Sequence, residues 1–490
     1  MWALSRGQQR RYNGDNRWIS ATNLTVSEPI IVVGAGLAGC EAAWQVAQAG
    51  LRVVLYEMRP AKRTPAHQTD QFGELVCSNS LKSDSPNSAP WQLKQEMRRC
   101  GSLLMASAET SRVPGGNALT VDRERFSAEI TRALVAHPLI EIRCEEITDV
   151  PPTGIVILAS GPLTSDPLAE AIARITGNDR LYFYDSISPI VWADSINMDV
   201  AFRANRYDKG LDDTADYINC PFNKAQYEQF LDALLDAHQY SPHIAEDVPY
   251  FESCLPIEEL ARRGRETLRF GPMKPVGLTD PRTDRWPYAA VQLRQENARA
   301  DSYNLVGFQN YLRYGEQQRV FRLIPGLENA EFVRYGQIHR NTYINAPALL
   351  NETLQLRNEP RVFFAGQICG VEGYVESIAT GLMAGVHAAA LAGGNAPRSM
   401  PRETALGSLC HYMTHADATR YQPANITFDL LPHLDEERRK RFRKDRKARH
   451  AEVCLDAIRA LELHLAANAG SSELGSESVA AALEMPRLVE

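Results

Sequence analysis

The feature that most constrains the fold is an apolar run that leads into a glycine turn. Residues 30–33 are apolar, the run Gly34-Ala35-Gly36-Leu37-Ala38-Gly39 follows, and helix-forming residues come next. A second apolar run, residues 51–56, ends at Glu57. Strand, glycine turn, helix, strand and acid is the order of a dinucleotide-binding βαβ unit, in which the acid lies about 20 residues after the turn.

The residue types in this unit have separate expected roles. Gly34 permits a tight turn, Gly36 lets a pyrophosphate approach the backbone, and Gly39 lets the helix pack on the strand. The helix N-terminus offers free N–H groups to phosphates, and Glu57 is placed to accept from ribose hydroxyls. The alternative is an ordinary α/β domain with a glycine turn. The pattern predicts a dinucleotide bound by Gly34, Ala35, Gly36, Leu37, Ala38, Gly39 and Glu57.

A second element of this kind occurs late in the chain. The apolar run at 361–365 ends in Gly366 and Gln367, and a helix rich in small residues is expected at 377–390. Two such elements can bracket one long dinucleotide, which favours tightly bound FAD over a dissociable nicotinamide. No second G-x-G-x-x-G motif lies between residues 150 and 340. A nicotinamide reductant would therefore dock transiently against the flavin.

The 490 residues suffice for two or three domains. We predict the α/β class, with a discontinuous, glutathione-reductase-like FAD-binding Rossmann domain at 29–195 and 330–467 and an inserted α+β domain at 196–329. The inserted stretch is rich in Asp, Arg, Tyr and Pro. We expect a flexible extension at 1–28 and a disordered tail at 468–490. Helices are expected at 91–110, 126–136 and 436–447.

Composition narrows the functional classes. Hydrophobic residues make up 44% and charged residues 23%, as in soluble globular proteins. No apolar run reaches the roughly 20 residues of a membrane span, and residues 1–28 lack the apolar core of a signal peptide. We therefore expect a cytoplasmic protein. The net charge of −7 means that a site for a polyanion must be a local patch. The nine cysteines lack C-x-x-C spacing, which argues against a disulfide framework and a zinc site, so no metal is predicted.

Several motifs together resemble a known family, the folate- and FAD-dependent tRNA (uracil-5-)-methyltransferases known as TrmFO. The resemblance covers roughly residues 29 to 465, and the loop around Cys77 and the run at 270–278 are its most specific parts. The segments that carry it, in order, are Val33 to Gly39, Glu57-Met58-Arg59-Pro60, Thr64-Pro65-Ala66-His67, Leu75-Val76-Cys77-Ser78-Asn79-Ser80, Phe251 to Pro256, Phe270 to Leu278, and His339-Arg340-Asn341-Thr342-Tyr343.

The resemblance implies a reaction. The family forms 5-methyluridine at position 54 in the T-loop of tRNA, with 5,10-methylenetetrahydrofolate as the carbon donor. Reduced FAD carries the methylene group and supplies electrons, and NAD(P)H is the reductant. A thiolate adds to C6 of the uracil so that C5 becomes nucleophilic, and a base then removes the C5 proton. The implied partners are tRNA and these small molecules, with no membrane and no obligate protein partner.

The resemblance assigns two cysteines to this chemistry. Cys254, which lies two residues before Pro256 and has Arg262, Arg263 and Lys274 further along the chain, would be the C6 nucleophile. Cys77, in a polar loop, would cap the flavin–methylene adduct. Residue types alone leave open that either thiol is a small core residue. Cys220, also followed by proline, is easily confused with the nucleophile. We expect the remaining thiols to be structural, namely Cys40, Cys100, Cys144, Cys220, Cys369, Cys410 and Cys454.

The tRNA phosphates require Arg and Lys near the active site. The charged candidates are Arg59, Lys62, Arg63, Arg262, Arg263, Arg265 and the run 438–447, although interleaved acids also suit a solvated face. The aromatic candidates for stacking on a base or the pterin are Tyr303, Phe308, Tyr311, Tyr335 and Tyr343. His339 and Arg340 could shape the flavin or folate pocket.

Three other functions remain open from the residues. The first is a flavin-dependent oxidoreductase of a small substrate, which would not bind tRNA. The second is a non-catalytic, FAD-containing RNA-binding module, which would not depend on either thiol. The third is a tRNA wobble-uridine modifying flavoprotein, from a sister family that shares the glycine turn and a similar Ala-Gly-Gln.

Overall fold

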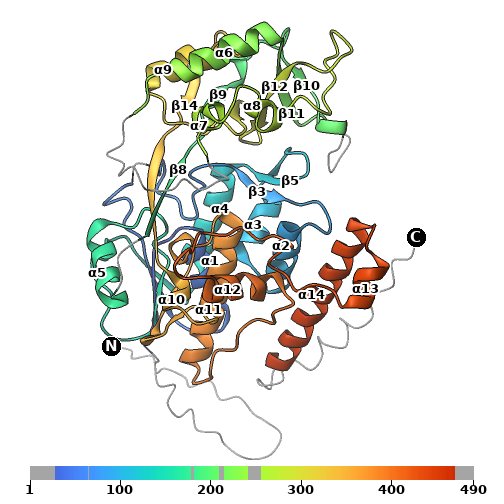
Figure 1. Ribbon diagram of the computed structural model, residues 1–490. Helices are drawn as coiled ribbons and strands as arrows, with labels where there is room; N and C mark the ends of the chain where they lie inside the picture. The colour runs from blue at the N-terminus through green and yellow to red at the C-terminus, as the bar shows by residue number, and fades with distance from the viewer. Residues whose placement is uncertain (1–27, 65, 178–180, 209–213, 241–254, 470–490) are drawn as a thin grey trace, which may run out of the picture.

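Strands from both ends of the chain form one six-stranded sheet, ordered β16-β17-β7-β1-β2-β6. All neighbours are parallel except β16 and β17. The computed structural model describes residues 28–64, 66–177, 181–208, 214–240 and 255–469, and this sheet lies in the lower part of the molecule in Figure 1. Its strands are β1 (Ile30–Val33), β2 (Val53–Tyr56), β6 (Ile140–Arg143), β7 (Val156–Leu158), β16 (Gln355–Leu356) and β17 (Glu359–Phe364).

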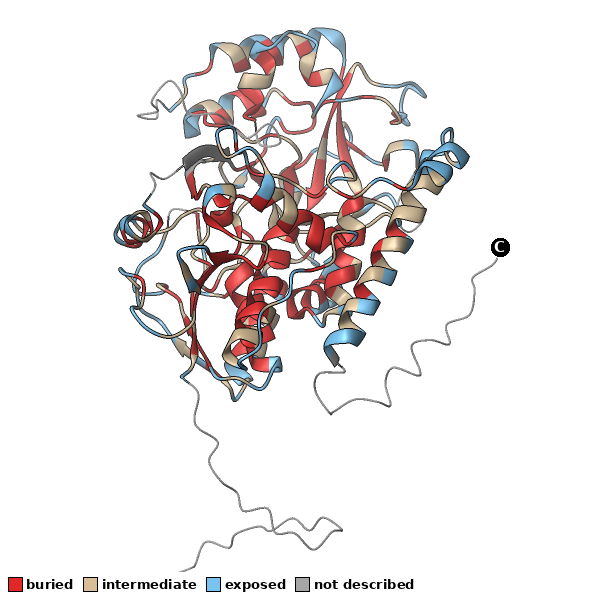
Figure 2. Ribbon diagram, turned by 60° about the horizontal axis from the view of Figure 1, so that its bottom comes forward, coloured by how far each residue is buried: buried red, intermediate tan, exposed pale blue. Residues whose placement is uncertain are grey.

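Helices α1 (Leu37–Gln48) and α11 (Tyr374–Ala392) pack closely because two glycines of α11 face α1. A Cβ at Gly381 of α11 would lie 2.2 Å from the carbonyl oxygen of Ala38 in α1. A Cβ at Gly385 would lie 2.6 Å from that of Ala42. Among the described residues, α11 alone has the length and apolar composition of a membrane span, but 72% of that stretch is buried within the protein. It is therefore a core helix; Figure 2 shows in red the buried residues that make up the interior of the molecule.

The stretch 91–110 is not one helix, as predicted, but two. Gly101 has a φ of 72°, a conformation suited to glycine, and Ser102 then caps a new helix by accepting from the N–H of Met105. The 126–136 helix begins earlier than predicted, at Arg123, and the 436–447 stretch is divided between two helices.

The remaining elements around the first sheet are helices and one small sheet. They are α2 (Ala89–Arg99), α3 (Leu103–Thr110), α4 (Arg123–Ala136), α5 (Asp166–Thr176), α10 (Ala346–Leu349), α12 (Ala405–His415), α13 (Glu436–Arg441), α14 (Arg446–Ala469), η4 (Gln367–Cys369) and a small sheet of β3 (Ser80–Ser83), β4 (Arg112–Val113) and β5 (Ala118–Val121).

A second six-stranded sheet has its own core and lies in the upper part of Figure 1, with the order β10-β11-β12-β13-β9-β14. Its neighbouring strands are antiparallel. Side chains of its strands, helices and loops, such as Phe230, Phe308 and Phe321, are fully buried. The elements are β9 (Ile190–Trp192), β10 (Phe202–Arg203), β11 (Tyr217–Phe222), β12 (Ala289–Gln295), β13 (Ser302–Leu305), β14 (Phe332–Arg334), η1 (Ala193–Ser195), η2 (Arg206–Asp208), α6 (Lys224–Asp236), α7 (Ile257–Arg262), α8 (Thr267–Phe270) and α9 (Tyr314–Phe321).

The two sheets are joined by an antiparallel pair of strands, β8 (Leu181–Ser186) and β15 (Ile338–Tyr343), with Ile338 opposite Ser186. The chain thus leaves the first sheet along β8 and returns along β15. This architecture confirms the predicted class, a Rossmann-like α/β unit interrupted by an α+β unit. The domain boundaries at 196 and 329 stay predictions; β9 and β14, which lie just outside them, belong to the second sheet. The predicted extension and tail lie almost wholly outside the described residues.

Candidate active site

A cavity opens at the carboxyl ends of the parallel strands, where doubly wound sheets bind their ligands. Its space, including the open mouth, is about 1030 Å³, the size of a cofactor site. Of the residues predicted to bind the cofactor, all but Ala35 and Gly39 lie on its wall. The wall includes Gly34, Gly36, Leu37, Ala38, Glu57, Ser160, Gly161, Gly366, Gln367, Tyr374 and Ser377.

The glycine turn has the geometry that its sequence predicts. Gly34 has a φ of 102°, and a Cβ there would lie 2.6 Å from the carbonyl oxygen of Ala159. A Cβ at Gly39 would lie 1.8 Å from the carbonyl oxygen of Gly34. These two glycines are required by the fold itself. At Gly36, in contrast, a Cβ would meet no atom within 4 Å, so this position leaves space for a ligand instead.

The acid at the end of β2 belongs to a buried charge cluster. Glu57 accepts hydrogen bonds from the N–H of Ala35 at 2.9 Å and from Nε of Arg59 at 2.8 Å. Arg59 also pairs with Glu74 at 3.2 Å and is only 2% exposed. Burial raises the pKa of Glu57, but the hydrogen bonds and charge of Arg59 outweigh it, so the pKa is lowered. Glu57 therefore lies on the cavity wall as a carboxylate, and Arg59, predicted to contact tRNA, is instead a buried partner of that acid.

A second helix N-terminus faces the same cavity. Tyr374 and Ser377, in the first turn of α11, are on its wall. Neither Gly36 before α1 nor Gly373 before α11 provides a side-chain cap. Gln367 is fixed by a 2.8 Å hydrogen bond to Glu372. Two uncapped helix N-termini attract phosphate, and the open space at Gly36 admits it. The residues present therefore fit the phosphates and ribose of FAD.

The loop that carries Cys77 lies against this wall, next to Val76 of the cavity lining. The hydroxyl of Tyr374 accepts from the backbone N–H of Cys77 at 2.6 Å and of Ser78 at 3.2 Å. Nη2 of Arg123 donates to the carbonyl of Cys77 at 2.9 Å, and Nη1 of Arg334 donates to that of Val76 at 2.8 Å. The backbone on both sides of the thiol is thus held.

The two arginines also bring positive charge to the thiol. Burial lowers the pKa of Arg334, the charge of Arg123 lowers it further, and Cys77 acts in the opposite direction. Burial also lowers the pKa of Arg123, but Glu296 and, more weakly, Cys77 outweigh it, so that pKa is raised overall. Cys77 therefore lies within electrostatic reach of both guanidinium groups, the environment in which a thiol reacts as a thiolate.

The second sheet supplies further support for this loop. From β12, Arg294 donates to Oδ1 of Asn79 at 2.9 Å and to Oγ of Ser78 at 2.7 Å. The side chain of Asn79 donates in turn to the carbonyl of Gln295 at 2.8 Å. Glu296, directly after β12, pairs with Arg123. These contacts could not be predicted from the sequence, since Arg294 lies in no recognisable motif.

The other cysteines that the structure describes differ in how deeply they are buried. Cys254 lies outside the described residues. Cys220 is completely buried in β11, and burial raises the pKa of its thiol far above the usual range. It is therefore a core residue and a poor nucleophile. Cys144, expected to be structural, is exposed instead, because it follows the last strand of the sheet edge.

Most of the predicted tRNA-contacting cations are already paired. Lys62 pairs with Glu146, Arg63 with Asp70, and Arg265 with Glu228 and Asp232. Arg262 pairs with Glu259. Of the aromatic candidates, Tyr303, Phe308, Tyr311 and Tyr343 are at most 5% exposed, and Tyr335 stacks between Tyr314 and Phe332. The side chains of His339 and Arg340 lie outside the described structure.

The basic run near the C-terminus lines a separate groove of about 1300 Å³, including its mouth, between α13 and α14. Arg438 is paired with Asp435 and Asp456. The guanidinium groups of Arg439, Arg443 and Arg449 line the groove without an ion pair to any residue that the structure describes. Phe428 stacks on His450 at 3.8 Å beside them. This groove thus combines unpaired cations with an aromatic surface.

Comparisons with known proteins identify the family. The model for "Glucose inhibited division protein A" (GIDA) matches residues 29–396. Two methylenetetrahydrofolate--tRNA-(uracil-5-)-methyltransferases TrmFO, from Solibacter usitatus (strain Ellin6076) and Koribacter versatilis (strain Ellin345), are 65% and 64% identical to this chain. Each match covers 89% of this chain and 98% of the relative.

A solved structure of Aquifex aeolicus GidA is similar in fold, with a TM-score of 0.65 and 17% identity over 89% of this chain and 76% of that one. The two TrmFO relatives confirm the resemblance seen in the sequence motifs. The chain belongs to the GIDA family and, within it, to the methylenetetrahydrofolate--tRNA-(uracil-5-)-methyltransferases known as TrmFO.

Proposed function

We propose that this protein forms 5-methyluridine at position 54 in the T-loop of tRNA, with 5,10-methylenetetrahydrofolate as the carbon donor. The observation that carries the proposal is the cavity with two uncapped helix N-termini beside the held Cys77 loop, in a chain 65% identical to a TrmFO. That identity favours this activity over the wobble-uridine modification of the sister family. The protein acts in the cytoplasm, where its tRNA substrate is found.

The cofactor site is assigned to Gly34, Ala35, Gly36, Leu37, Ala38, Gly39, Glu57, Gly366 and Gln367. The N–H groups at the start of α1 and α11 hold the pyrophosphate, and Glu57 accepts from a ribose hydroxyl. Ala35 and Gly39 act from beneath the wall: Ala35 donates its N–H to Glu57, and Gly39 sets the spacing of α1 from the turn. When bound, FAD relays the one-carbon unit and, after reduction by NAD(P)H, supplies the electrons that convert methylene to methyl.

The two thiols have separate roles in the proposal. Cys254 adds to C6 of the uracil, which makes C5 nucleophilic, and leaves again when the C5 proton has been removed. Cys77 acts on the flavin side, beside the guanidinium groups of Arg123 and Arg334. The base must leave the T-loop stack to reach both. Because the thiol is regained at the end, the net reaction replaces one C5 hydrogen by methyl and consumes the folate carbon and two electrons.

The basic groove between α13 and α14 is proposed to hold tRNA phosphates. Arg439, Arg443 and Arg449 are available there, whereas most other predicted cations are already paired. Unpaired cations beside a stacked aromatic pair suit a nucleic-acid backbone.

The test is a methyl-transfer assay with unmodified tRNA, NAD(P)H and methylenetetrahydrofolate labelled in its methylene carbon. We expect label in 5-methyluridine with the wild type, and none with Cys254→Ala or Cys77→Ala. Cys144→Ala is the matched control, because Cys144 is exposed and is not itself among the residues of the cavity wall, and it should keep full activity. If the FAD-loaded wild type transfers no label, the proposed function fails, and a flavin oxidoreductase of a small substrate becomes the leading alternative.

A further inference from the structure

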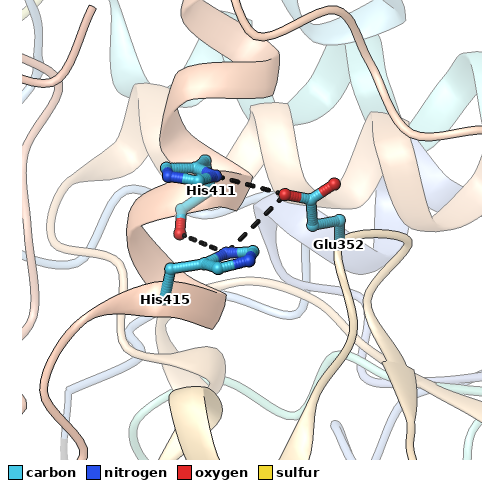
Figure 3. A group of neighbouring side chains, drawn as sticks. All are labelled: Glu352, His411 and His415. Atoms are coloured by element: carbon cyan, nitrogen blue, oxygen red, sulfur yellow. Dashed lines mark hydrogen bonds and ion pairs between the residues drawn. The ribbon is translucent and has the colours of Figure 1, made fainter.

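A cluster of three side chains, in the part of the molecule that contains the first six-stranded sheet, has no part in the chemistry above. His411 and His415 lie one turn apart on α12, and Glu352 approaches them from the loop between α10 and β16 (Figure 3). None of the three lines the cavity at the ends of the strands. The donor atoms, one from each residue, all lie within 4.8 Å of one another.

The donors converge on one carboxylate oxygen. Nδ1 of His411 lies 3.2 Å and Nδ1 of His415 3.6 Å from Oε1 of Glu352. The two imidazole rings are stacked, with centroids 4.2 Å apart and an interplanar angle of 17°. In a tetrahedral zinc site, with bonds of about 2.0–2.2 Å, neighbouring donor atoms are separated by roughly 3.3 Å. Both measured N···O distances are close to that separation.

The side that carries the carboxylate is preorganised. Oδ1 of Asn351 accepts from the N–H of Thr353 at 3.1 Å and of Gln355 at 3.0 Å, which fixes the loop around Glu352. On the helix side, Nδ1 of His415 also lies 3.2 Å from the carbonyl oxygen of His411. The same nitrogen lies 3.0 Å from Oγ1 of Thr414, and a metal ion bound at Nδ1 would replace both contacts.

We propose that Glu352, His411 and His415 bind a divalent transition-metal ion of the zinc class. Two imidazoles and one carboxylate are ligands that zinc, copper and nickel accept. All three side chains are between 38% and 51% exposed, so the ion can enter from solvent and complete its coordination with water. Bound there, it would fasten the end of α12 to the loop before β16, a structural role independent of the proposed methyl transfer.

One neighbouring charge opposes this site. Burial lowers the pKa of Arg402, while the charge of Glu352 acts in the opposite direction, so Arg402 lies within electrostatic reach of the carboxylate. Its positive charge reduces the affinity for a cation. We therefore expect the site to bind zinc reversibly and to lose it to strong chelators.

The experiment uses the full-length, FAD-loaded protein, stripped with EDTA and then equilibrated by dialysis against buffered Zn²⁺. Metal analysis should find a site that Glu352→Gln, His411→Asn and His415→Asn each weaken by at least about tenfold. His433→Asn is the matched control, because this histidine lines the other groove and should leave zinc binding unchanged. Zn²⁺ should also raise the Tm of the wild type and of His433→Asn more than that of the three site variants.

Two results would overturn the proposal. One is a wild-type protein that takes up no zinc. The other is zinc binding of undiminished affinity when both histidines are replaced, which would place the metal elsewhere, for instance on the exposed thiol of Cys144.

Discussion

Gly36 is a residue that we expect to matter for FAD binding but not for folding. A Cβ at Gly36 meets no atom within 4 Å, yet the position faces the space proposed for the pyrophosphate. We expect Gly36→Ala to leave the Tm of the FAD-free protein unchanged and to weaken FAD binding by at least about tenfold. Bound flavin absorbance and thermal unfolding measure the two effects.

The neighbouring glycines provide the contrast. Gly34→Ala places a Cβ 2.6 Å from a backbone oxygen at a positive φ and should cost about 1–3 kcal/mol of folding free energy. Gly315→Ala, equally open but on α9, should leave FAD binding unchanged and should not lower the folding free energy, because alanine favours the helix more than glycine does. A Gly36→Ala protein that retains FAD at wild-type affinity would show that the pyrophosphate does not lie at this turn.

A second residue-scale prediction concerns a buried acid. Glu96 of α2 accepts from the N–H groups of Ala405 and Leu406 at the start of α12, at 2.8 and 2.9 Å. Burial raises its pKa to about 7 from 4.5, although these hydrogen bonds act in the opposite direction. The folded state therefore holds a proton that the unfolded state releases between these two pH values. The stabilisation that this proton provides is complete below about pH 4.5 and is lost as the pH rises to about 7.

The expected result is a stability that falls with pH across this window, by up to about 1.4 kcal/mol per pH unit for such a group. Glu96→Gln should remove that contribution to the slope. Urea unfolding at a series of pH values between 4.5 and 7 measures it. An identical slope in the variant would mean that Glu96 titrates in the folded protein as it does in the unfolded chain.

At the scale of elements, the Cys77 loop depends on a strand of the other sheet. Arg294 of β12 donates to Asn79 and Ser78, so its loss removes two hydrogen bonds that position the loop. Arg294→Gln should retain FAD but lower kcat of methyl transfer by about tenfold or more, the result of misplacing a reacting group. Arg203→Gln, on β10 of the same sheet, loses only its contact with Tyr303 among the residues that the structure describes, and it serves as the control. An equal loss of activity in both variants would point to general damage to the sheet.

At the scale of the whole molecule, our proposal for the groove between α13 and α14 would extend the tRNA-binding surface beyond the cavity. The double variant Arg439→Glu/Arg443→Glu should weaken tRNA binding. It should also make the slope of log K against log salt concentration shallower, by the amount expected for the loss of about two phosphate contacts. Catalysis at saturating tRNA should be preserved, because neither residue lines the cavity. Filter binding at several salt concentrations measures this. Arg299→Glu, an exposed arginine paired with Asp301, is the control, and equal weakening in both proteins would exclude a specific role for the groove.

Much of the cofactor site could be predicted because its residues are local in sequence. The turn from Gly34 to Gly39 and the acid at Glu57 belong to one βαβ unit, whose geometry is determined by the residues of that unit and their hydrogen bonds. The apolar strands and the small-residue helix after Gln367 follow from the same short-range rules. The family, too, was recognisable from short motifs in their order along the chain.

The tertiary structure alone decided which side chains meet across long stretches of chain. Arg59 carries no sign in the sequence that it is buried between two acids, and its assignment to tRNA was therefore wrong. Arg294 reaches the Cys77 loop across more than 200 residues, and Glu352 meets His411 across 59. The physical reason is that a charge's role depends on its partners and burial, which packing determines, whereas a glycine's role in a turn depends on its own backbone angles.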